Sequence, residues 1–519
     1  MVGTRKPRKH IVNLAINWGG HLSALVVMFF LSPYVVGKLD ATEYGIWSLL
    51  SVLAGYMGIF DIGVRSSVGR HVALYLGKKD RVGVDETIRA GFGIFTLTGG
   101  LILAVGVLLG WLFPFLFKGI DPEHYSTVRF LLPLMVVNIW LSAIAAIYSS
   151  VLTAYDRFDI ARGVDFFVLL VRTVATVYAL HRGWGLWGLV GAIILGNFFA
   201  LIANRINGGK IHSGLRSFPL LFSRSRMKEL FGYGIYSFIS SVAFRVIGQS
   251  DLVIVGAVLS VAAVREYSVG AMLIYYSSPF ISMISATFFP SVQRKVAGGS
   301  MNDVQHLLYK QLKISMCFGL VTYIGLAFYA QSFIRLWMFQ DGFDMGAVVE
   351  AATVMSILAL SKLPSLYLIP CQSVLNAMGY ARFNAIRAIT EAVVNVSFSL
   401  FFVLSLGWGI AGVAAGTLVA RLLVASISVP VFLCSRANIS LKYFITTVII
   451  PGFLSAGLFS AICFALTYTW SISTWVDFIF QVLAAISGWG VISFYLLLTK
   501  DMRLELKNIY SKRFSSKNV

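Results

Sequence analysis

Basic residues inside long apolar segments are the side chains of this sequence best suited to chemistry. Six cations fall there, and one of them, Arg129, lies near an outer end from which it could snorkel to the interface. The other five are the candidates: Arg65, Arg172, Arg245, Lys362 and Arg421. A basic residue at the centre of a bilayer costs about 2.5–3.5 kcal/mol, so the four that lie near mid-segment cost roughly 10–14 kcal/mol together. Arg65 lies nearer a segment end and could also snorkel to the interface. Because exposure to lipid is so costly, we expect these side chains to line a polar cavity that suits an anionic ligand.

Four acids share the same kind of segment, Asp165 among them, and three are best placed for a role in coupling: Asp61, Asp251 and Glu391. Two roles are open for each, since a carboxylate in the membrane can bind a coupling cation or proton, or can neutralise a nearby arginine. Asp61 precedes Arg65 by four residues, which allows a local ion pair. Four polar residues are expected to line the same cavity: Asn17, His21, Asn197 and Asn395.

Polar and small residues also recur at helical spacing, which assigns them to one face of a helix. Ser237, Ser241, Arg245, Gly248 and Asp251 fall within roughly a third of a helix circumference. Comparable stripes in both halves of the chain predict a shared wet cavity with a small cationic excess. Small-residue stripes also permit close helix packing, and that alternative stays open for the first two segments.

The composition identifies the elements that position these residues. Of 519 residues, 58% are hydrophobic and only 12% are charged, whereas soluble chains carry about 25% charged residues. So little charge cannot cover the surface of several soluble domains. We therefore predict an all-α, polytopic membrane protein.

Fourteen segments are long and apolar enough to cross about 30 Å of hydrocarbon, which takes roughly 20 residues. They lie at residues 11–36, 45–69, 88–117, 126–153, 160–180, 184–205, 229–258, 266–292, 308–334, 346–376, 385–406, 408–433, 441–468 and 474–498. Pro364, two residues from Lys362, makes the tenth of these segments a candidate for bending, and a static kink is the alternative.

The loops give the orientation. If the N-terminus is cytoplasmic, the inner loops and tails hold 31 Lys and Arg residues and the outer loops hold five. Positive residues favour the cytoplasmic side, so both termini are predicted to be cytoplasmic. The net charge of +20 is then a topology signal, and we expect no binding of nucleic acid.

The second half of the chain repeats the first at a shift of about 224 residues. Residues 67–73 (SVGRHVA) match 291–297 (SVQRKVA), and 183–188 (GWGLWG) match 407–412 (GWGIAG). Six helices per copy predict two parallel lobes, a layout typical of alternating-access transporters. The expected parts are an N-lobe (1–205), a cytoplasmic linker (206–228), a C-lobe (229–433), two further helices (441–498) and a basic tail (499–519).

Signatures of an enzyme are missing from the sequence. It contains no Walker A loop, and its four cysteines, Cys317, Cys371, Cys434 and Cys463, are too far apart for a zinc or redox motif. We therefore expect no catalytic activity, no metal site and no cofactor, while coupling to Na⁺ or H⁺ stays open.

Several motifs carry a family resemblance. They are residues 36–47 (VGKLDATEYGIW), 60–63 (FDIG), 70–73 (RHVA), 372–379 (QSVLNAMG) and 409–417 (GIAGVAAGT). These resemble the Wzx-type polysaccharide flippases of the multidrug/oligosaccharidyl-lipid/polysaccharide exporter superfamily. The resemblance implies a bacterial inner-membrane protein that moves an undecaprenyl-diphosphate-linked oligosaccharide to the outer leaflet by alternating access. It also implies a cationic central cavity, contacts with membrane lipids and with polysaccharide polymerase or assembly proteins, and a monomeric transport unit.

Two other classes remain open at this stage. One is a cation-coupled exporter of small molecules on the same fold, which typically relies on acidic rather than basic residues in the membrane. The other is a membrane enzyme of glycan assembly, which commonly carries a large outer loop that this sequence lacks.

Overall fold

The structure is a computed structural model that describes residues 7–212, 215, 220–221, 235–340, 342–498 and 502–504. For residues 7–18, 21, 59–66, 235–241, 243 and 244 it describes the backbone alone. Throughout this part of the chain the regular elements are helices, apart from one isolated bridge between Gln340 and Phe343. The predicted all-α class is confirmed.

The chain forms two compact units. Unit 1 comprises Met1–Arg245 and Val255–Arg265. Its helices are α1 (Pro7–Lys38), α2 (Ala41–Met57), α3 (Ile59–Gly77), α4 (Arg81–Leu116), α5 (Glu123–Ala154), α6 (Phe158–His181) and α7 (Gly185–Ile211), and it also holds the first half of α9 (Ile235–Ile254) and the π-helical turn η1 (Val255–Leu259). Within it, α5 packs against both α4 and α7, and α6 packs against α7.

Small residues allow the closest of these approaches. Gly110 on α4 faces the backbone of Arg129 on α5, where an added Cβ would lie 3.3 Å from the carbonyl oxygen. Gly58 separates α2 from α3, so the segment predicted as one span over residues 45–69 is two helices. The Gly58 N–H donates hydrogen bonds to the carbonyls of Ala54 and Tyr56, which closes the end of α2.

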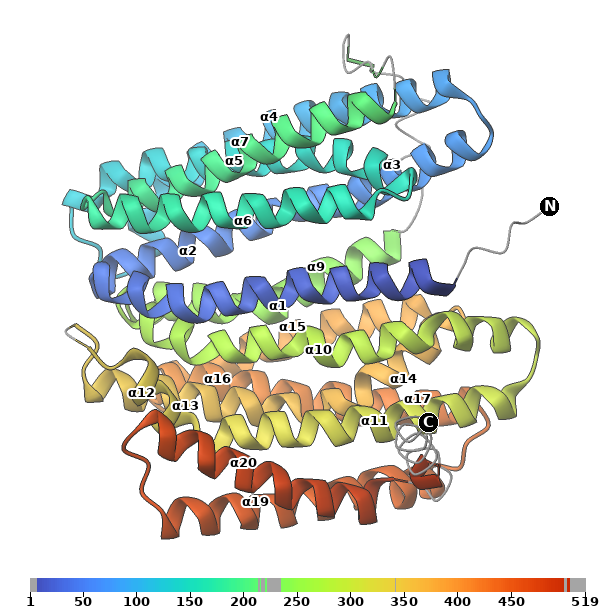
Figure 1. Cartoon of the computed structure of the whole chain (residues 1–519). Helices are drawn as coiled ribbons and strands as arrows, with labels where there is room; N and C mark the ends of the chain where they lie inside the picture. Colours follow the sequence, from blue (N-terminus) through green and yellow to red (C-terminus); the bar gives the residue numbers. More distant parts are fainter. Residues whose placement is uncertain are drawn as a thin grey trace, which may run out of the picture. The chain divides into compact units, whose positions relative to one another are not determined.

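Unit 2 comprises Val246–Ile254 and Glu266–Val519. Its helices are the second half of α9, α10 (Ala263–Ala297), α11 (Met301–Phe328), α12 (Ala330–Met338), α13 (Met345–Lys362), α14 (Ser365–Ala377), α15 (Ala381–Leu404), α16 (Gly409–Ala420), α17 (Ser426–Arg436), α18 (Leu441–Phe444), α19 (Ile450–Thr469) and α20 (Trp475–Ile492). Three π-helical turns extend its helices: η2 (Arg421–Ala425), η3 (Ile445–Ile449) and η4 (Ser493–Leu497). The last hairpin, α19 and α20, lies side by side (Figure 1).

That hairpin is tied to α11 by side chains that bond main-chain carbonyls. The Trp489 indole N–H donates to Cys317 O over 2.8 Å, and the Lys313 ammonium donates to Thr447 O over 2.8 Å. Buried apolar residues of α11, α14, α17, α19 and α20 fill the space around these bonds. The two additional helices therefore belong structurally to unit 2.

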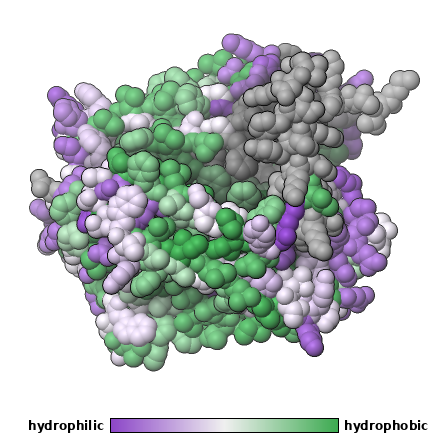
Figure 2. Space-filling view, turned by 60° about the horizontal axis from the view of Figure 1, so that its bottom comes forward, coloured by the Kyte–Doolittle hydropathy of each residue, from purple (hydrophilic) through white to green (hydrophobic). Residues whose placement is uncertain are grey.

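Length and composition fit a membrane environment. Among the described residues, eleven helices are long and apolar enough to span a bilayer, and Leu22–Lys38 is a shorter apolar helix. Figure 2 shows extensive apolar surface, with hydrophilic residues gathered toward its margins. The protein is a multi-pass membrane protein, while the count of fourteen spans stays a prediction.

The predicted domain limits also stay predictions. The boundary between the compact units falls at Arg245, inside α9. The predicted linker over residues 206–228 begins within α7, which continues to Ile211, and most of its remainder lies outside the described residues. The same holds for the tail over residues 499–519, of which 502–504 are described.

Candidate functional site

Two irregular helices meet in unit 2 through a hydrogen bond. The tenth predicted segment is interrupted near Pro364: α13 ends at Lys362 and α14 begins at Ser365, because Pro364 has no N–H to continue the helix. On the neighbouring helix, Arg421 opens the π-helical turn η2. Its Nη1 donates to the Ser365 hydroxyl over 2.8 Å. Single π-helical turns frequently mark functional sites, which makes this junction a place to look for one.

A buried carboxylate joins two arginines at this junction. Arg421 Nε lies 2.6 Å from Glu391 Oε1. Arg387, one helical turn before Glu391 on α15, forms an ion pair with Glu391 Oε2. The side chains of Arg387 and Glu391 are 3% and 2% exposed, and that of Arg421 is 14% exposed. The surroundings therefore screen these charges poorly. Arg421 Nε and Glu391 Oε1 form an ion pair without hydrogen-bond geometry among the described residues.

Lys362 adds a third cation. It interacts electrostatically with Arg421, Glu391 and Asp251, and within the described part of the chain no hydrogen-bond or ion-pair partner of its ammonium is found. We call Lys362, Arg387, Glu391 and Arg421 the cationic cluster. With every member ionised, the cluster carries a net charge of +2.

A second polar group, the Asp251 network, lies alongside. Asp251 Oδ2 accepts hydrogen bonds from the Tyr267 hydroxyl over 2.6 Å and the Thr417 hydroxyl over 2.9 Å. Asn395 Nδ2 donates to Thr417 Oγ1 over 2.6 Å, and the Ser250 hydroxyl donates to Asn395 Oδ1 over 3.2 Å. Asp251 Oδ1 is buried and accepts no hydrogen bond from the described residues.

One helix connects the two groups. Glu391 of the cationic cluster and Asn395 of the Asp251 network are four residues apart on α15, so they lie one above the other on the same face. The absence of a side chain at Gly416 brings α16 close to that helix, since an added Cβ would lie 2.5 Å from the Ser399 backbone nitrogen. A change in one group can therefore reach the other through α15.

Unit 1 carries a neutral counterpart of the cluster. Asn197 Nδ2 donates to Asn138 Oδ1 over 2.7 Å, linking α7 to α5. At the repeat shift of 224 residues, Asn138 corresponds to Lys362 and Asn197 to Arg421, while the apolar Phe167 corresponds to Glu391. The positions of Lys362 and Arg421 thus hold an amide pair in unit 1, whereas the position of Arg387 keeps an arginine, Arg162.

The structure brings five of the residues predicted from sequence into one region of unit 2: Asp251, Lys362, Glu391, Asn395 and Arg421. Asn197 pairs with Asn138 in unit 1. Arg172 on α6 and Arg245 on α9 are half-buried in unit 1, with no ion-pair partner among the described residues. Four predicted residues have side chains outside the described part: Asn17 and His21 on α1, and Asp61 and Arg65 on α3.

Four contributors were missed from the sequence: Ser250, Tyr267, Ser365 and Thr417. Arg387 was counted among the loop cations, although it is buried. Its spacing of four residues from Glu391 nevertheless placed the two on one helix face in the sequence. Hydroxyl residues such as Thr417 give no comparable signal in an apolar helix.

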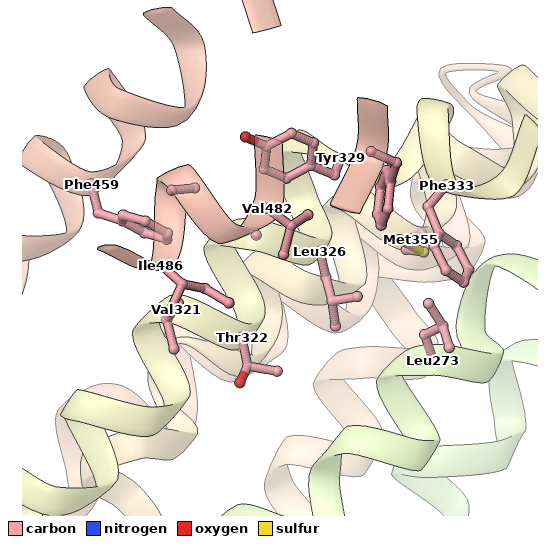
Figure 3. A pocket seen from close by; sticks show the side chains of 13 residues that line it. Leu273, Val321, Thr322, Leu326, Tyr329, Phe333, Met355, Phe459, Val482 and Ile486 are labelled. Atoms are coloured by element: carbon pink, nitrogen blue, oxygen red, sulfur yellow. The ribbon is translucent and has the colours of Figure 1, made fainter. Parts of the chain in front are cut away.

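Two other features suit different ligands. A pocket of about 340 Å³ in unit 2 is lined almost entirely by apolar side chains, including Leu326, Phe333, Met355 and Val482 (Figure 3). It offers hydrocarbon contact and no charge for an anion.

Asp121, Glu123 and His124 place ligand atoms within 4.8 Å of one another, but the two acids are exposed and the group lies on a loop and the first turn of α5.

The fold and this site define a class: a two-unit, multi-pass membrane protein of the transporter type with a charged site buried among its helices. Comparison with known proteins gives the family. Residues 39–341 match the polysaccharide biosynthesis protein family, and the chain belongs to it.

Known relatives and structures agree with this assignment. A putative O-antigen transporter of Shigella flexneri is 20% identical over 378 residues, covering 71% of this chain and 85% of the relative. The structure of the lipid II flippase MurJ in an inward closed conformation has a TM-score of 0.64 at 16% identity, covering 93% of this chain and 98% of that one. An inward-facing multidrug resistance MATE family transporter of the MOP superfamily has a TM-score of 0.64 at 14% identity, covering 80% and 95%. The chain thus has the fold that these proteins share.

Proposed function

We propose that the protein is a flippase that moves an undecaprenyl-diphosphate-linked oligosaccharide from the cytoplasmic to the outer leaflet of a bacterial inner membrane. Its family and the O-antigen transporter it resembles support a glycan on a lipid carrier. The two-unit fold supports alternating access. In this proposal both termini are cytoplasmic, as the distribution of basic residues predicts.

The single observation that carries the proposal is the cationic cluster. A diphosphate that links a lipid to a sugar has one negative charge on each phosphate, and the cluster has a net charge of +2 when Lys362, Arg387, Glu391 and Arg421 are ionised. Arginine forks also match phosphate oxygens in geometry. The cluster can therefore replace the hydration that the diphosphate loses on entering the membrane interior.

The Asp251 network is the part best suited to coupling. Glu391 already forms ion pairs with two arginines, whereas Asp251 Oδ1 has neither an ion-pair partner nor a hydrogen-bond donor among the described residues. Carbonyl and hydroxyl oxygens of Asn395 and Thr417 lie nearby. We propose that a Na⁺ ion or a proton at Asp251 drives the cycle, and that α15 transmits its presence to the cluster.

Replacement of arginines in a strain that depends on the protein tests the anion site. We expect Arg421→Ala to abolish or severely reduce polysaccharide export while the protein still inserts, and we expect the same of Arg172→Ala and Arg245→Ala. Arg→Lys at each position should restore part of the export, because the charge survives although the bidentate fork is lost. The matched control is Arg382→Ala, which removes an exposed cation near the start of α15.

The result of this test separates a substrate role from a structural one. A structural role predicts a loss of protein level in step with export, with equal damage from Ala and Lys. Full export by well-expressed Ala variants at all three positions would refute the cationic site. Transport of cationic dyes by the purified protein would instead support the small-molecule exporter class.

A further inference from the structure

The two contacts of Glu391 differ in kind. Its ion pair with Arg387 lies within α15, at a spacing of four residues, so an intact helix keeps the two side chains within reach of each other. Its contact with Arg421, 2.6 Å from Oε1 to Nε, joins α15 to the π-helical turn η2. Only the second contact depends on the position of α15 relative to η2.

Carboxylate and phosphate compete for the same donors. Each presents two oxygens to a guanidinium in similar geometry, so either can occupy the Nε edge of Arg421. Ser365 holds the Nη1 atom of Arg421 through a neutral hydroxyl. The guanidinium therefore keeps its position when the anion at its other edge is exchanged.

From these contacts we propose that Glu391 is an internal stand-in for the substrate phosphate. In the empty site its carboxylate neutralises Arg421, and on binding it yields Arg421 to a phosphate while it stays paired with Arg387. This inference rests on the proposed function and assigns Glu391 as a positioning residue. Binding is then an exchange of one anion for another, which limits how tightly the diphosphate is held and speeds its release.

The internal repeat is in line with this role. Where the first copy carries the neutral pair Asn138 and Asn197, the position of Glu391 is occupied by Phe167. The acid is thus missing where Lys362 and Arg421 are replaced by amides, although Arg387 keeps a counterpart in Arg162, which pairs with Asp165 instead. A simple neutralising residue would show the same pattern, so the two roles must be separated by the direction of an affinity change.

Glu391→Gln provides that separation because it keeps the size of the side chain and removes its charge. The full-length protein in nanodiscs would be titrated with undecaprenyl diphosphate and with undecaprenyl monophosphate, and binding followed by tryptophan fluorescence. We expect the variant to bind the diphosphate at least tenfold more tightly and to turn over more slowly, with a lower KM and a lower kcat. Asp303→Asn, which removes an exposed partner of Lys295, is the control and should change neither.

A second variant, which keeps the negative charge, separates the proposed role of Glu391 from an effect of misfolding. Glu391→Asp keeps the charge beside Arg387 but shortens the reach to Arg421, and we expect a smaller gain in diphosphate affinity, about threefold. Unchanged or weaker binding by both variants, with thermal unfolding equal to wild type, would overturn the stand-in role while leaving the proposed function intact. Failure of the wild-type protein to bind or flip diphosphate lipids would overturn the proposed function itself.

Discussion

Gly416→Ala probes the packing that holds the site together. The added Cβ would lie 2.5 Å from the Ser399 backbone nitrogen and 2.7 Å from its Cα, so α16 and α15 must separate by roughly 1 Å to restore van der Waals contact. Overpacking of this kind costs about 1–3 kcal/mol. The Asn395–Thr417 hydrogen bond, 2.6 Å long, crosses the same interface and would lengthen past the limit for a bond.

We therefore expect Gly416→Ala to lower the unfolding temperature of the purified protein and to reduce gradient-dependent transport further than the loss of folded protein explains. Thermal unfolding in detergent and transport in proteoliposomes measure the two effects on one preparation. Gly457→Ala on α19 is the matched control, since nothing lies within 4 Å of its added Cβ. If Gly416→Ala behaves like Gly457→Ala in both assays, helix contact at Gly416 does not organise the site.

Three further predictions follow from the same contacts. Asp251→Asn should abolish the dependence of transport on an ion gradient while the diphosphate still binds, and gradient-driven transport equal to wild type would exclude Asp251 as the coupling site. Asn138→Ala should destabilise the protein by about 1–3 kcal/mol, because Asn197 loses its buried partner, and should leave the KM for the lipid-linked glycan unchanged; a raised KM would show that the amide pair contacts substrate. Tags at both chain ends should be accessible only from the cytoplasm and a tag at Gly119 only from outside, and opposite accessibility of the two ends would refute the predicted topology.

Much of the architecture was predictable because membrane insertion imposes strong rules on sequence. Long apolar segments and sparse charge predicted the helical membrane class, and Pro364 predicted the break between α13 and α14. The boundary of the compact units at Arg245 had no such signal. It depends on contacts between helices that are distant in sequence.

The site was predictable in part for the same reason. Lys362 and Arg421 stand out because inserting a cation into the membrane interior costs free energy, so such residues are rare and mark functional sites. The sequence left open whether Glu391 binds an ion or neutralises an arginine, and the structure places it between Arg387 and Arg421. The pairing of carboxylates with cations on other helices depends on helix rotation and on packing such as that at Gly416. Residue spacing along a single helix does not determine this pairing.

The most direct test of the account is flipping by the purified protein. Proteoliposomes would carry a fluorescent undecaprenyl-diphosphate-linked oligosaccharide, and a membrane-impermeant quencher would report its arrival in the exposed leaflet. We predict that wild-type protein exchanges the lipid between leaflets many times faster than protein-free liposomes, and that Arg421→Ala returns the rate to that background. Equal rates for wild-type protein and Arg421→Ala, or no flipping above background by either, would contradict a flippase that binds its substrate at the cationic cluster.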